Sequence, residues 1–295
     1  MCRALAYLGE PLLLDDVLFE ADSSLVRQAT DPKLMTLLNL GGFGLAAWDA
    51  GSPDPELPFL YRTPSIPTFD RNLKALAEKV HATALIAHVR GVVYDPAESV
   101  GPQNLHPFRF PGARVALAQN GDLAGFGAMR FDLLEHVRPE LAAQIGGTTD
   151  TEWIYALLLS QLERPLDAPD PDELAEAVRR SLTIVRRARE RRGIAVQSPI
   201  NLVISDGSCL IATRFVYDYG WYLEDDSFFA GEREYDFTSL WYTTAGVDAT
   251  TSITVASEPL TSDRSEWLEA PAYSMLVVKP AGGGGLSVET LELEL

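Results

Sequence analysis

The order of extended and helical segments constrains the fold of this chain more than any other feature. Short apolar segments that suit β-strands come first, amphipathic segments that suit helices fill the middle, and short strands return from residue 201 onward. This order differs from the strict alternation of a doubly wound sheet, and it favours two antiparallel sheets packed face to face with helices outside. The expected strands cover residues 2–8, 83–90, 115–119, 201–205, 209–217, 239–244, 252–257 and 272–279, with one more after the glycines at 41–44, and the expected helices cover residues 22–28, 70–81, 131–144, 151–162 and 172–192.

Length, charge and cysteine content narrow the class of protein. A chain of 295 residues permits one domain or two, but no linker-like break divides it, so we expect a single domain over 1–295 with a strand-rich part at 200–295. The net charge of −18 disfavours nucleic acid as a partner, because an acidic surface repels phosphates. No stretch reaches the apolar length of a membrane span, and two cysteines make no disulfide framework, so we expect a cytoplasmic protein away from membranes. Neither metal-ligand spacing nor a phosphate-binding glycine motif occurs, so we expect no metal and no cofactor.

Cys2 is the first candidate for catalysis. A thiol is a strong nucleophile once a base removes its proton. Removal of Met1 would expose the α-amino group of Cys2, which has a reference pKa of about 7.7–8.0 and is partly a free base at neutral pH. That amine can take the thiol proton and later give it to a leaving amine, so that one residue serves as nucleophile and base. Taken alone, an incidental buried cysteine is the simpler interpretation.

Two further segments carry side chains suited to binding a substrate. Arg90 ends an expected strand, and its planar guanidinium suits a substrate carboxylate, although a surface salt bridge is the plain alternative. His106 lies in the segment Asn104-Leu105-His106-Pro107-Phe108, whose residue types equally suit an ordinary turn.

Asn120-Gly121 and Asp150 complete the set of candidates. The Asn120 carboxamide and the Gly121 backbone N–H are two donors directly after an expected strand, which is the composition of an oxyanion hole. Asn-Gly is also a strong hairpin signal, and both interpretations can hold together. The Asp150 carboxylate can bind a substrate ammonium, while Thr149 or Asp150 can equally act as the cap of the following helix.

Together these segments resemble the class II glutamine amidotransferases, which are N-terminal-nucleophile (Ntn) hydrolases whose catalytic cysteine follows the initiator methionine. The resemblance covers about residues 2–152 and continues weakly to Ser257-Glu258-Pro259-Leu260. With Trp267 behind it, that last segment looks like the stand-alone YafJ-like branch, which includes the ergothioneine-pathway amidohydrolase and the amidase subunit of a glutathione-degrading complex.

The resemblance implies a four-layer αββα sandwich and a role for each candidate residue. Two departures from the family pattern concern Gln119, where a histidine is usual before the Asn-Gly pair, and residues 91–93, where many members carry a small polar residue. We expect Gln119 to be structural. The implied roles are Cys2 as nucleophile and base, Asn120 and Gly121 as oxyanion hole, Arg90 and Asp150 as the clamp for the α-carboxylate and α-ammonium of a γ-glutamyl group, Gly42 and Gly44 as the glycine-rich turn beside the nucleophile, and His106 as a further substrate-binding residue.

We therefore predict an amidohydrolase that cleaves a γ-glutamyl amide through a Cys2 thioester and releases glutamate. No synthetase domain follows the hydrolase core, so an amidase subunit that delivers ammonia to, or acts with, a separate synthetase or peptidase chain stays open, as does a homo-oligomer. A non-catalytic binding subunit is a further alternative. An apolar acyl amidase related to bile-salt hydrolases or penicillin acylases is disfavoured, because Arg90 and Asp150 suit a zwitterionic head group.

One conspicuous feature is left without a functional role. Many arginines lie on the helix expected over residues 172–192. In an acidic chain, such a run is most often a solvated face with salt bridges, and a docking surface is the minority interpretation.

Overall fold

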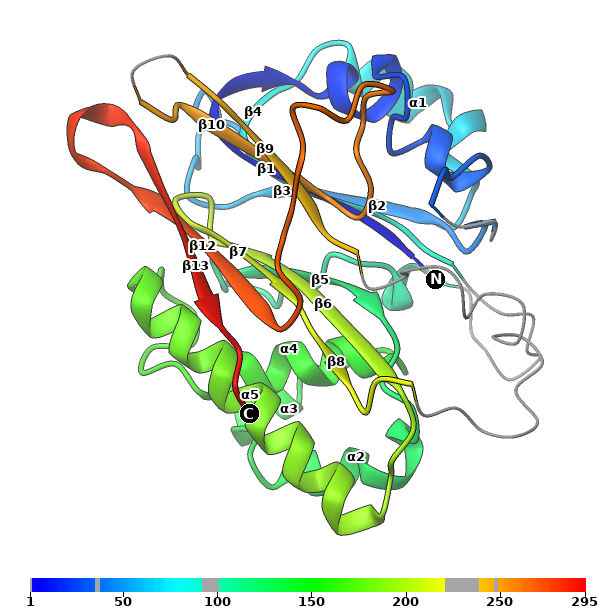
Figure 1. The fold of residues 1–295 in the computed structure, drawn as a ribbon, viewed down its shortest axis with the longest axis vertical. Coiled ribbons are helices and arrows are strands. Elements are labelled where there is room, and N and C mark those ends of the chain that lie inside the picture. Colours follow the sequence, from blue (N-terminus) through cyan, green and yellow to red (C-terminus); the bar gives the residue numbers. More distant parts are fainter. Residues whose placement is uncertain (1, 35–37, 92–100, 221–238, 247–248) are drawn as a thin grey trace.

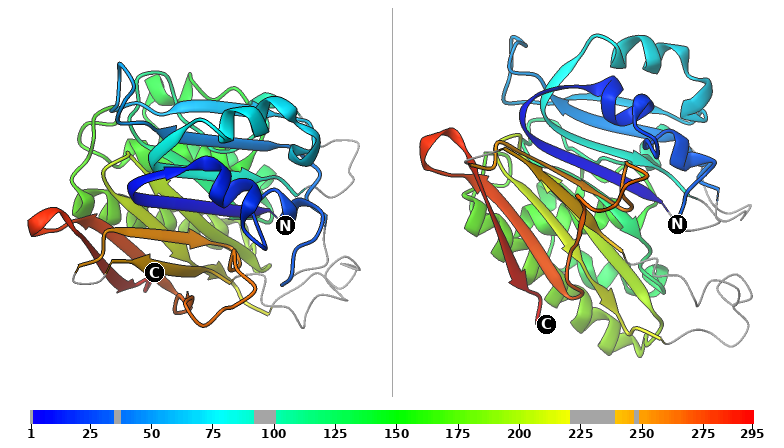
Figure 2. Two further views of the ribbon diagram at one scale, coloured as in Figure 1. Left: turned by 90° about the horizontal axis from the view of Figure 1, so that it is seen from above. Right: turned by 45° about the horizontal axis from the view of Figure 1, so that its top comes forward.

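The computed structural model describes residues 2–34, 38–91, 101–220, 239–246 and 249–295. These residues form two β-sheets that pack face to face, with helical segments over both outer faces (Figures 1 and 2). The strand pairs recorded within the sheets are all antiparallel. The expected α+β fold with the layer order helix, sheet, sheet, helix is confirmed.

The first sheet has seven strands, and its central strand begins directly after Cys2. This strand, β1 (Arg3–Leu13), lies between β4 (His81–Val89) and β10 (Ser252–Ala256). One end of the chain is therefore paired with a segment near the other end. The complete order is β11-β9-β10-β1-β4-β2-β3, in which the other strands are β2 (Phe43–Trp48), β3 (Phe59–Thr63), β9 (Trp241–Ala245) and β11 (Leu268–Glu269).

The second sheet has the order β13-β12-β7-β6-β5, with β8 paired to β6. Its edge strand β5 (Ala116–Gly121) ends on the Asn-Gly pair. The other strands are β6 (Ser198–Ser205), β7 (Leu210–Arg214), β8 (Val216–Tyr217), β12 (Ser274–Pro280) and β13 (Leu286–Glu292).

The alternation of side chains along β1 explains why the first sheet packs against other layers on both of its faces. Successive side chains of a strand point to opposite faces of the sheet. Ala4, Ala6 and Leu8 enter the apolar layer between the two sheets. Leu5 and Tyr7 face the other way, toward the short helical segments that cover the first sheet. A third apolar cluster lies between the second sheet and the longer helices.

Helices α4 (Asp150–Ser160) and α5 (Pro171–Arg192) cover the second sheet. The ends of α5 follow from its sequence. The Asp170 carboxylate accepts the N–H of Asp172 at 2.9 Å and Pro171 occupies the first turn. Gly193 closes the helix in the left-handed conformation, with φ at 66°.

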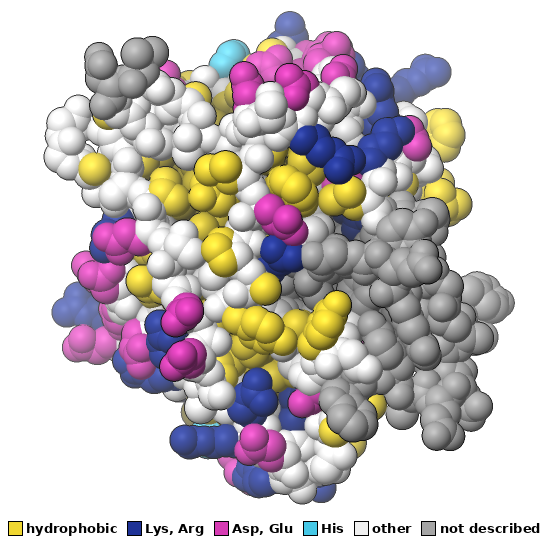
Figure 3. Space-filling view, in the orientation of Figure 1, with side chains coloured by type: hydrophobic (Ala, Val, Ile, Leu, Met, Phe, Trp, Pro, Cys, Tyr) yellow, Lys and Arg dark blue, Asp and Glu magenta, His cyan; other side chains and the backbone are white. Residues whose placement is uncertain are grey.

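The arginines of α5 pair largely with acidic neighbours. Arg180 lies 3.2 Å from Glu176, and Arg192 lies 2.6 Å from Asp132. Figure 3 shows basic and acidic side chains side by side over the lower left of the molecule, where α5 runs in Figure 1. The interpretation of this run as a solvated, salt-bridged face agrees with these contacts.

Two of the expected helices are wrong in extent. Residues 22–28 form only a 3-10 turn at Arg27–Ala29, because the N–H of Val26 bonds to the carbonyl of Leu18 and not, as in a helix, to that of Asp22. The helix expected over 131–144 is two helices, α2 (Phe126–Leu134) and α3 (Pro139–Ala142). The break falls at Arg138, which is extended (ψ 137°) because a residue before proline avoids the helical conformation.

Three strands had no counterpart among the expected ones. β13 follows a glycine-rich turn, and its polar residues alternate with only a few apolar ones, as suits an edge strand. β3 lies within the proline-rich stretch 51–67, and β11 has only two residues. The seven-residue helix α1 (Arg71–Ala77) lies inside the expected range 70–81, and its N-cap is Asp70, whose carboxylate accepts the N–H groups of Asn72 and Leu73 at 3.0 Å.

Candidate active site

Cys2 lies at the start of the central strand, beside the end of β4. The pairing of Arg3 with Val89 brings the Cys2 thiol to Gly91, whose N–H lies 3.4 Å from Sγ and whose carbonyl oxygen lies 3.7 Å from it. The side chain is only 8% exposed. Burial raises the pKa of the Cys2 thiol, and the N–H of Gly91 and the Arg90 guanidinium oppose that rise only in part. A thiol held in this way needs a base at the moment of reaction.

Arg90 directly follows β4 and is held by the glycine-rich turn. Its backbone N–H donates to the carbonyl of Gly42, and its own carbonyl accepts the N–H of Gly41, both at 2.8 Å. Gly42 has φ at 109°, and a Cβ there would lie 2.8 Å from the Thr63 carbonyl oxygen, so only glycine fits. A Cβ on Gly44 would lie 2.1 Å from the carbonyl oxygen of His106. Both glycines therefore permit a close approach of neighbouring backbone, Gly42 in the turn that holds Arg90 and Gly44 within β2.

Asn120 and Gly121 end β5, opposite Asn201 and Ile200 of β6. The Asn120 side chain is 2% exposed, and its Nδ2 donates to the hydroxyl oxygen of Ser257 at 2.9 Å. A Cβ on Gly121 would lie 1.8 Å from the carbonyl oxygen of Pro199, so the close approach of two backbones requires glycine here. The hairpin interpretation of Asn-Gly is wrong, because the chain continues from β5 into α2.

Asp150 is the first residue of α4. The carboxylate accepts the backbone N–H groups of Thr151 at 2.7 Å and Leu123 at 2.8 Å, and the side-chain amide of Gln119 at 3.3 Å. Burial raises the pKa of this carboxyl, and these hydrogen bonds oppose the rise. The N-cap position itself is held by Thr149, whose side chain makes no cap bond. Asp150 is thus a desolvated carboxylate whose orientation is fixed by three donors.

Gln119 connects Asp150 to the histidines between the sheets. Its Oε1 accepts the Thr151 hydroxyl at 3.2 Å, and its backbone N–H donates to Nδ1 of His106 at 3.3 Å. Its carbonyl oxygen lies 3.0 Å from Nε2 of His88, and the two imidazole rings stack with their centroids 4.2 Å apart. Gln119 thus contacts both His106 and Asp150. These contacts fit the structural role that was expected for Gln119.

The segment before Asp150 is fixed by two buried polar side chains that sequence reasoning did not assign. Asn104 bonds to Thr148 twice, through Nδ2 at 3.0 Å to the hydroxyl and through Oδ1 at 2.8 Å to the backbone N–H. The Glu152 carboxylate accepts the N–H groups of Gly146 at 3.0 Å and Gly147 at 2.6 Å. The segment Asn104 to Phe108 was singled out for its histidine, but its asparagine also makes structural contacts.

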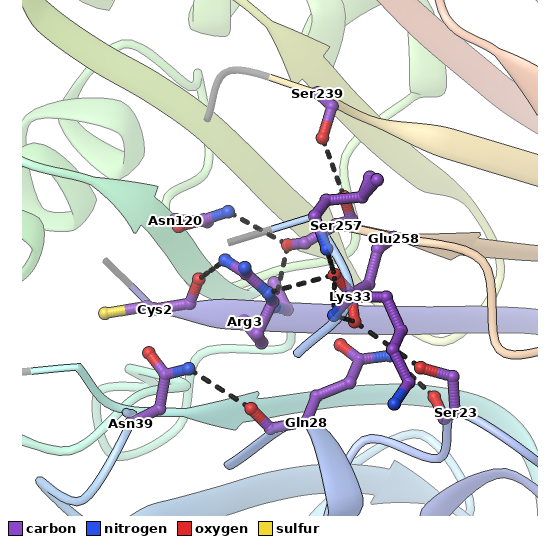
Figure 4. A network of polar contacts seen from close by, with 12 residues as sticks. Cys2, Arg3, Ser23, Gln28, Lys33, Asn39, Asn120, Ser239, Ser257 and Glu258 are labelled. Carbon is purple, nitrogen blue, oxygen red and sulfur yellow. Dashed lines mark hydrogen bonds and ion pairs between the residues drawn. The ribbon is translucent and has the colours of Figure 1, made fainter. Parts of the chain in front are cut away.

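A network around Ser257 and Glu258 is the largest feature that had no predicted role (Figure 4). Arg3 and Glu258 form a buried ion pair, with Nε 3.7 Å from Oε2. The same guanidinium donates to the Cys2 carbonyl at 3.0 Å, and Glu258 accepts the N–H groups of Lys33 and Leu34. The resemblance at residues 257–260 was the only signal that marked this network.

The buried histidines predict acid sensitivity. Burial lowers the pKa of His88 to about 3 and the pKa of His106 well below its usual value, so both rings are neutral in the folded protein. The unfolded chain takes up these protons below about pH 6.5, so stability is lost as pH falls from there, and for His88 the loss should reach about 2 kcal/mol at pH 5.

His88→Gln should therefore reduce the difference in unfolding free energy between pH 7 and pH 5, measured in urea, by about 2 kcal/mol. The matched control is His136→Gln, which changes an exposed histidine and should leave that difference unaltered. An unchanged pH dependence in His88→Gln would contradict a neutral, buried ring.

The described residues offer neither a metal site nor a membrane-spanning helix. Among these residues, no group of three or more histidine, cysteine, aspartate or glutamate side chains is arranged to hold a metal ion. Within the same part of the chain, none of the helices combines the length and apolar character needed to cross a membrane.

The fold and the candidate site together define an Ntn-hydrolase-like protein with a cysteine at position 2. The family model of the class II glutamine amidotransferases matches residues 41–284, and the chain belongs to this family. One relative of this chain is the "probable glutamine amidotransferase DUG3" of Saccharomyces cerevisiae. The two proteins are 28% identical over 300 residues, which cover 95% of this chain and 82% of the yeast protein.

Solved structures agree on the fold. A glutamine aminotransferase class-II domain protein from Silicibacter pomeroyi superposes with a TM-score of 0.64 at 23% identity, over 99% of this chain and all of that one. The glutamine phosphoribosylpyrophosphate amidotransferase of B. subtilis superposes with a TM-score of 0.59 at 16% identity, over the whole of this chain and 50% of its own. At these identities the likeness concerns the fold alone.

Proposed function

We propose that this protein hydrolyses the amide bond of a γ-glutamyl substrate with Cys2 as nucleophile. One observation carries the proposal: Arg90 and Asp150 both lie close enough to the buried Cys2 thiol to influence its pKa. A cation and an anion beside one nucleophile match the α-carboxylate and α-ammonium of a γ-glutamyl group.

The proposed reaction needs no group beyond these residues and the terminal amine. After Met1 is removed, the α-amine of Cys2 takes the thiol proton while Sγ attacks the δ-carbonyl carbon. The developing oxyanion receives hydrogen bonds from Asn120 Nδ2 and the Gly121 N–H. The C–N bond breaks as the α-ammonium protonates the leaving amine, which leaves a γ-glutamyl thioester on Cys2. Water then attacks the thioester and releases glutamate together with the free thiol.

Two measurements on the untagged protein test this proposal. Intact mass before and after a diazo-ketone analogue of glutamine should reveal loss of Met1 and a single adduct on Cys2. Incubation with glutamine and with γ-glutamyl peptides should release glutamate. A protein that keeps Met1 and takes no adduct would contradict the proposal and favour a non-catalytic binding subunit.

An amidase that acts with a separate synthetase or peptidase chain is the second candidate. The yeast relative carries the name of an amidotransferase, and an amidotransferase needs an acceptor for its ammonia. This candidate requires a stable complex with a partner chain and glutamate release that rises when the partner is added. Full activity of the isolated chain would favour simple hydrolysis instead.

A further inference from the structure

Ser257 joins the nucleophile strand to the proposed oxyanion hole. Its hydroxyl oxygen accepts two hydrogen bonds, from the backbone N–H of Ala4 at 3.0 Å and from Nδ2 of Asn120 at 2.9 Å. Ala4 lies two residues after Cys2, and Asn120 ends the edge strand of the other sheet. One oxygen atom of Ser257 therefore connects the two sheets at the site (Figure 4).

The position of this oxygen is itself fixed from several sides. Ser257 directly follows β10, and its backbone N–H donates to the Ala4 carbonyl at 3.0 Å. Its own carbonyl accepts the Ser239 hydroxyl at 3.0 Å. The neighbouring Glu258 is held by Arg3 and by two backbone N–H groups. The hydroxyl of Ser257 is thus a rigid reference point rather than a mobile surface group.

The position of the Asn120 carboxamide depends on the Ser257 hydroxyl. A carboxamide has two N–H donors, so the bond to Ser257 leaves one donor for a substrate oxyanion. On its other side, the Asn120 Oδ1 atom is buried and makes no hydrogen bond within the described residues. Within the described residues, the bond to Ser257 is the one hydrogen bond of this carboxamide, so it ties the position of the amide to the Ser257 oxygen.

We propose that Ser257 is a positioning residue that holds the Asn120 carboxamide in its oxyanion-binding orientation and in register with Cys2. The proposal rests on the hydrolase function proposed above and adds a residue from near the other end of the chain to its machinery. Ser257 itself touches no reacting atom. Its loss should slow the steps that generate an oxyanion and leave the nucleophilicity of the thiol unchanged.

The test compares two reactions of Cys2 in Ser257→Ala. Hydrolysis of a γ-glutamyl amide passes through an oxyanion, whereas alkylation of the thiol by iodoacetamide does not. We expect kcat to fall about 10- to 100-fold, less than the roughly 10²- to 10³-fold loss typical when an oxyanion donor is removed outright. KM and the alkylation rate, followed by intact mass, should stay within about twofold of wild type, because binding and thiol do not depend on the amide.

Three further variants separate positioning from general damage. Ser181→Ala removes a buried hydroxyl of α5 that bonds to the Ala177 carbonyl within the same helix, and it should keep the wild-type kcat. Ser257→Thr retains a hydroxyl and should recover most of the activity. In an Asn120→Ala background, Ser257→Ala should lower kcat by less than about threefold, because two residues that act as a unit are not additive.

Each contrary result overturns the proposal. A wild-type kcat in Ser257→Ala, a full additional loss in the Asn120→Ala background, or an equal loss of alkylation would each show that Ser257 does not act through Asn120. A wild-type protein that releases no glutamate would instead refute the hydrolase function, and the positioning role with it.

Discussion

Replacing Cys2 with alanine is expected to abolish glutamate release, with kcat at least about 10⁴-fold below wild type. The reason is that Sγ forms the covalent intermediate, while the α-amine that remains has no thiol proton to accept. Glutamate released from glutamine or a γ-glutamyl peptide is the quantity to measure. The adduct with the diazo-ketone analogue should disappear from the intact mass at the same time.

The matched control for Cys2→Ala is Cys209→Ala. Cys209 is fully buried, within the apolar cluster beneath the helices of the second sheet, where burial raises the pKa of its thiol. Cys209→Ala should therefore still form the adduct and should release glutamate at the wild-type rate. Residual hydrolysis in Cys2→Ala at more than a tenth of the wild-type rate would exclude Cys2 as the nucleophile.

The second large effect is expected from Arg90→Gln. Truncating one partner of a buried charge pair typically costs about 2–5 kcal/mol, so kcat/KM for a γ-glutamyl substrate should fall by roughly 30- to 4,000-fold. The loss should depend on the substrate. Wild type should prefer a free α-carboxylate over the matching α-amide, and Arg90→Gln should treat the two alike. If Arg90→Gln kept this preference, Arg90 would not be the group that binds the α-carboxylate.

Asp150 should make the binding of the substrate ammonium depend on pH. Only the ionised carboxylate attracts an ammonium, and burial raises the pKa of this carboxyl. On acidification, Asp150 therefore takes up its proton at a higher pH than an ordinary aspartate, and KM should rise from that pH downward. Asp150→Asn should raise KM throughout and flatten this acidic limb. A limb that persists in the variant would have to arise from another group.

Local patterns in the sequence predicted much of the scaffold. The helix expected over 172–192 is Pro171–Arg192, and the strand expected over 252–257 is Ser252–Ala256. Capping residues, proline and glycine determine where an element begins or ends through contacts within a few residues, so the sequence alone predicts these boundaries. The break at Arg138 follows from the same local rule, which the single helix expected over 131–144 did not take into account.

The parts that were not predicted depend on contacts between distant segments. The bond between Asn120 and Ser257 spans 137 residues, and the ion pair between Arg3 and Glu258 spans nearly the whole chain. No spacing reveals which residue of β10 will face β1, because register is set by the packed core rather than by the strand alone. The candidate residues Cys2, Arg90, Asn120, Gly121 and Asp150 were found by resemblance, whereas the groups that hold them required the structure.

The pairing of Leu5 with Ala256 also bears on how the protein is made. A ribosome releases β1 long before β10, so one edge of an apolar central strand lacks its partner during the synthesis of the segments between them. Pairings between such distant segments form slowly, and an open strand edge invites association with other chains. The nascent protein should therefore depend on chaperones more than its size suggests, until the β1–β10 ladder covers the second edge of β1.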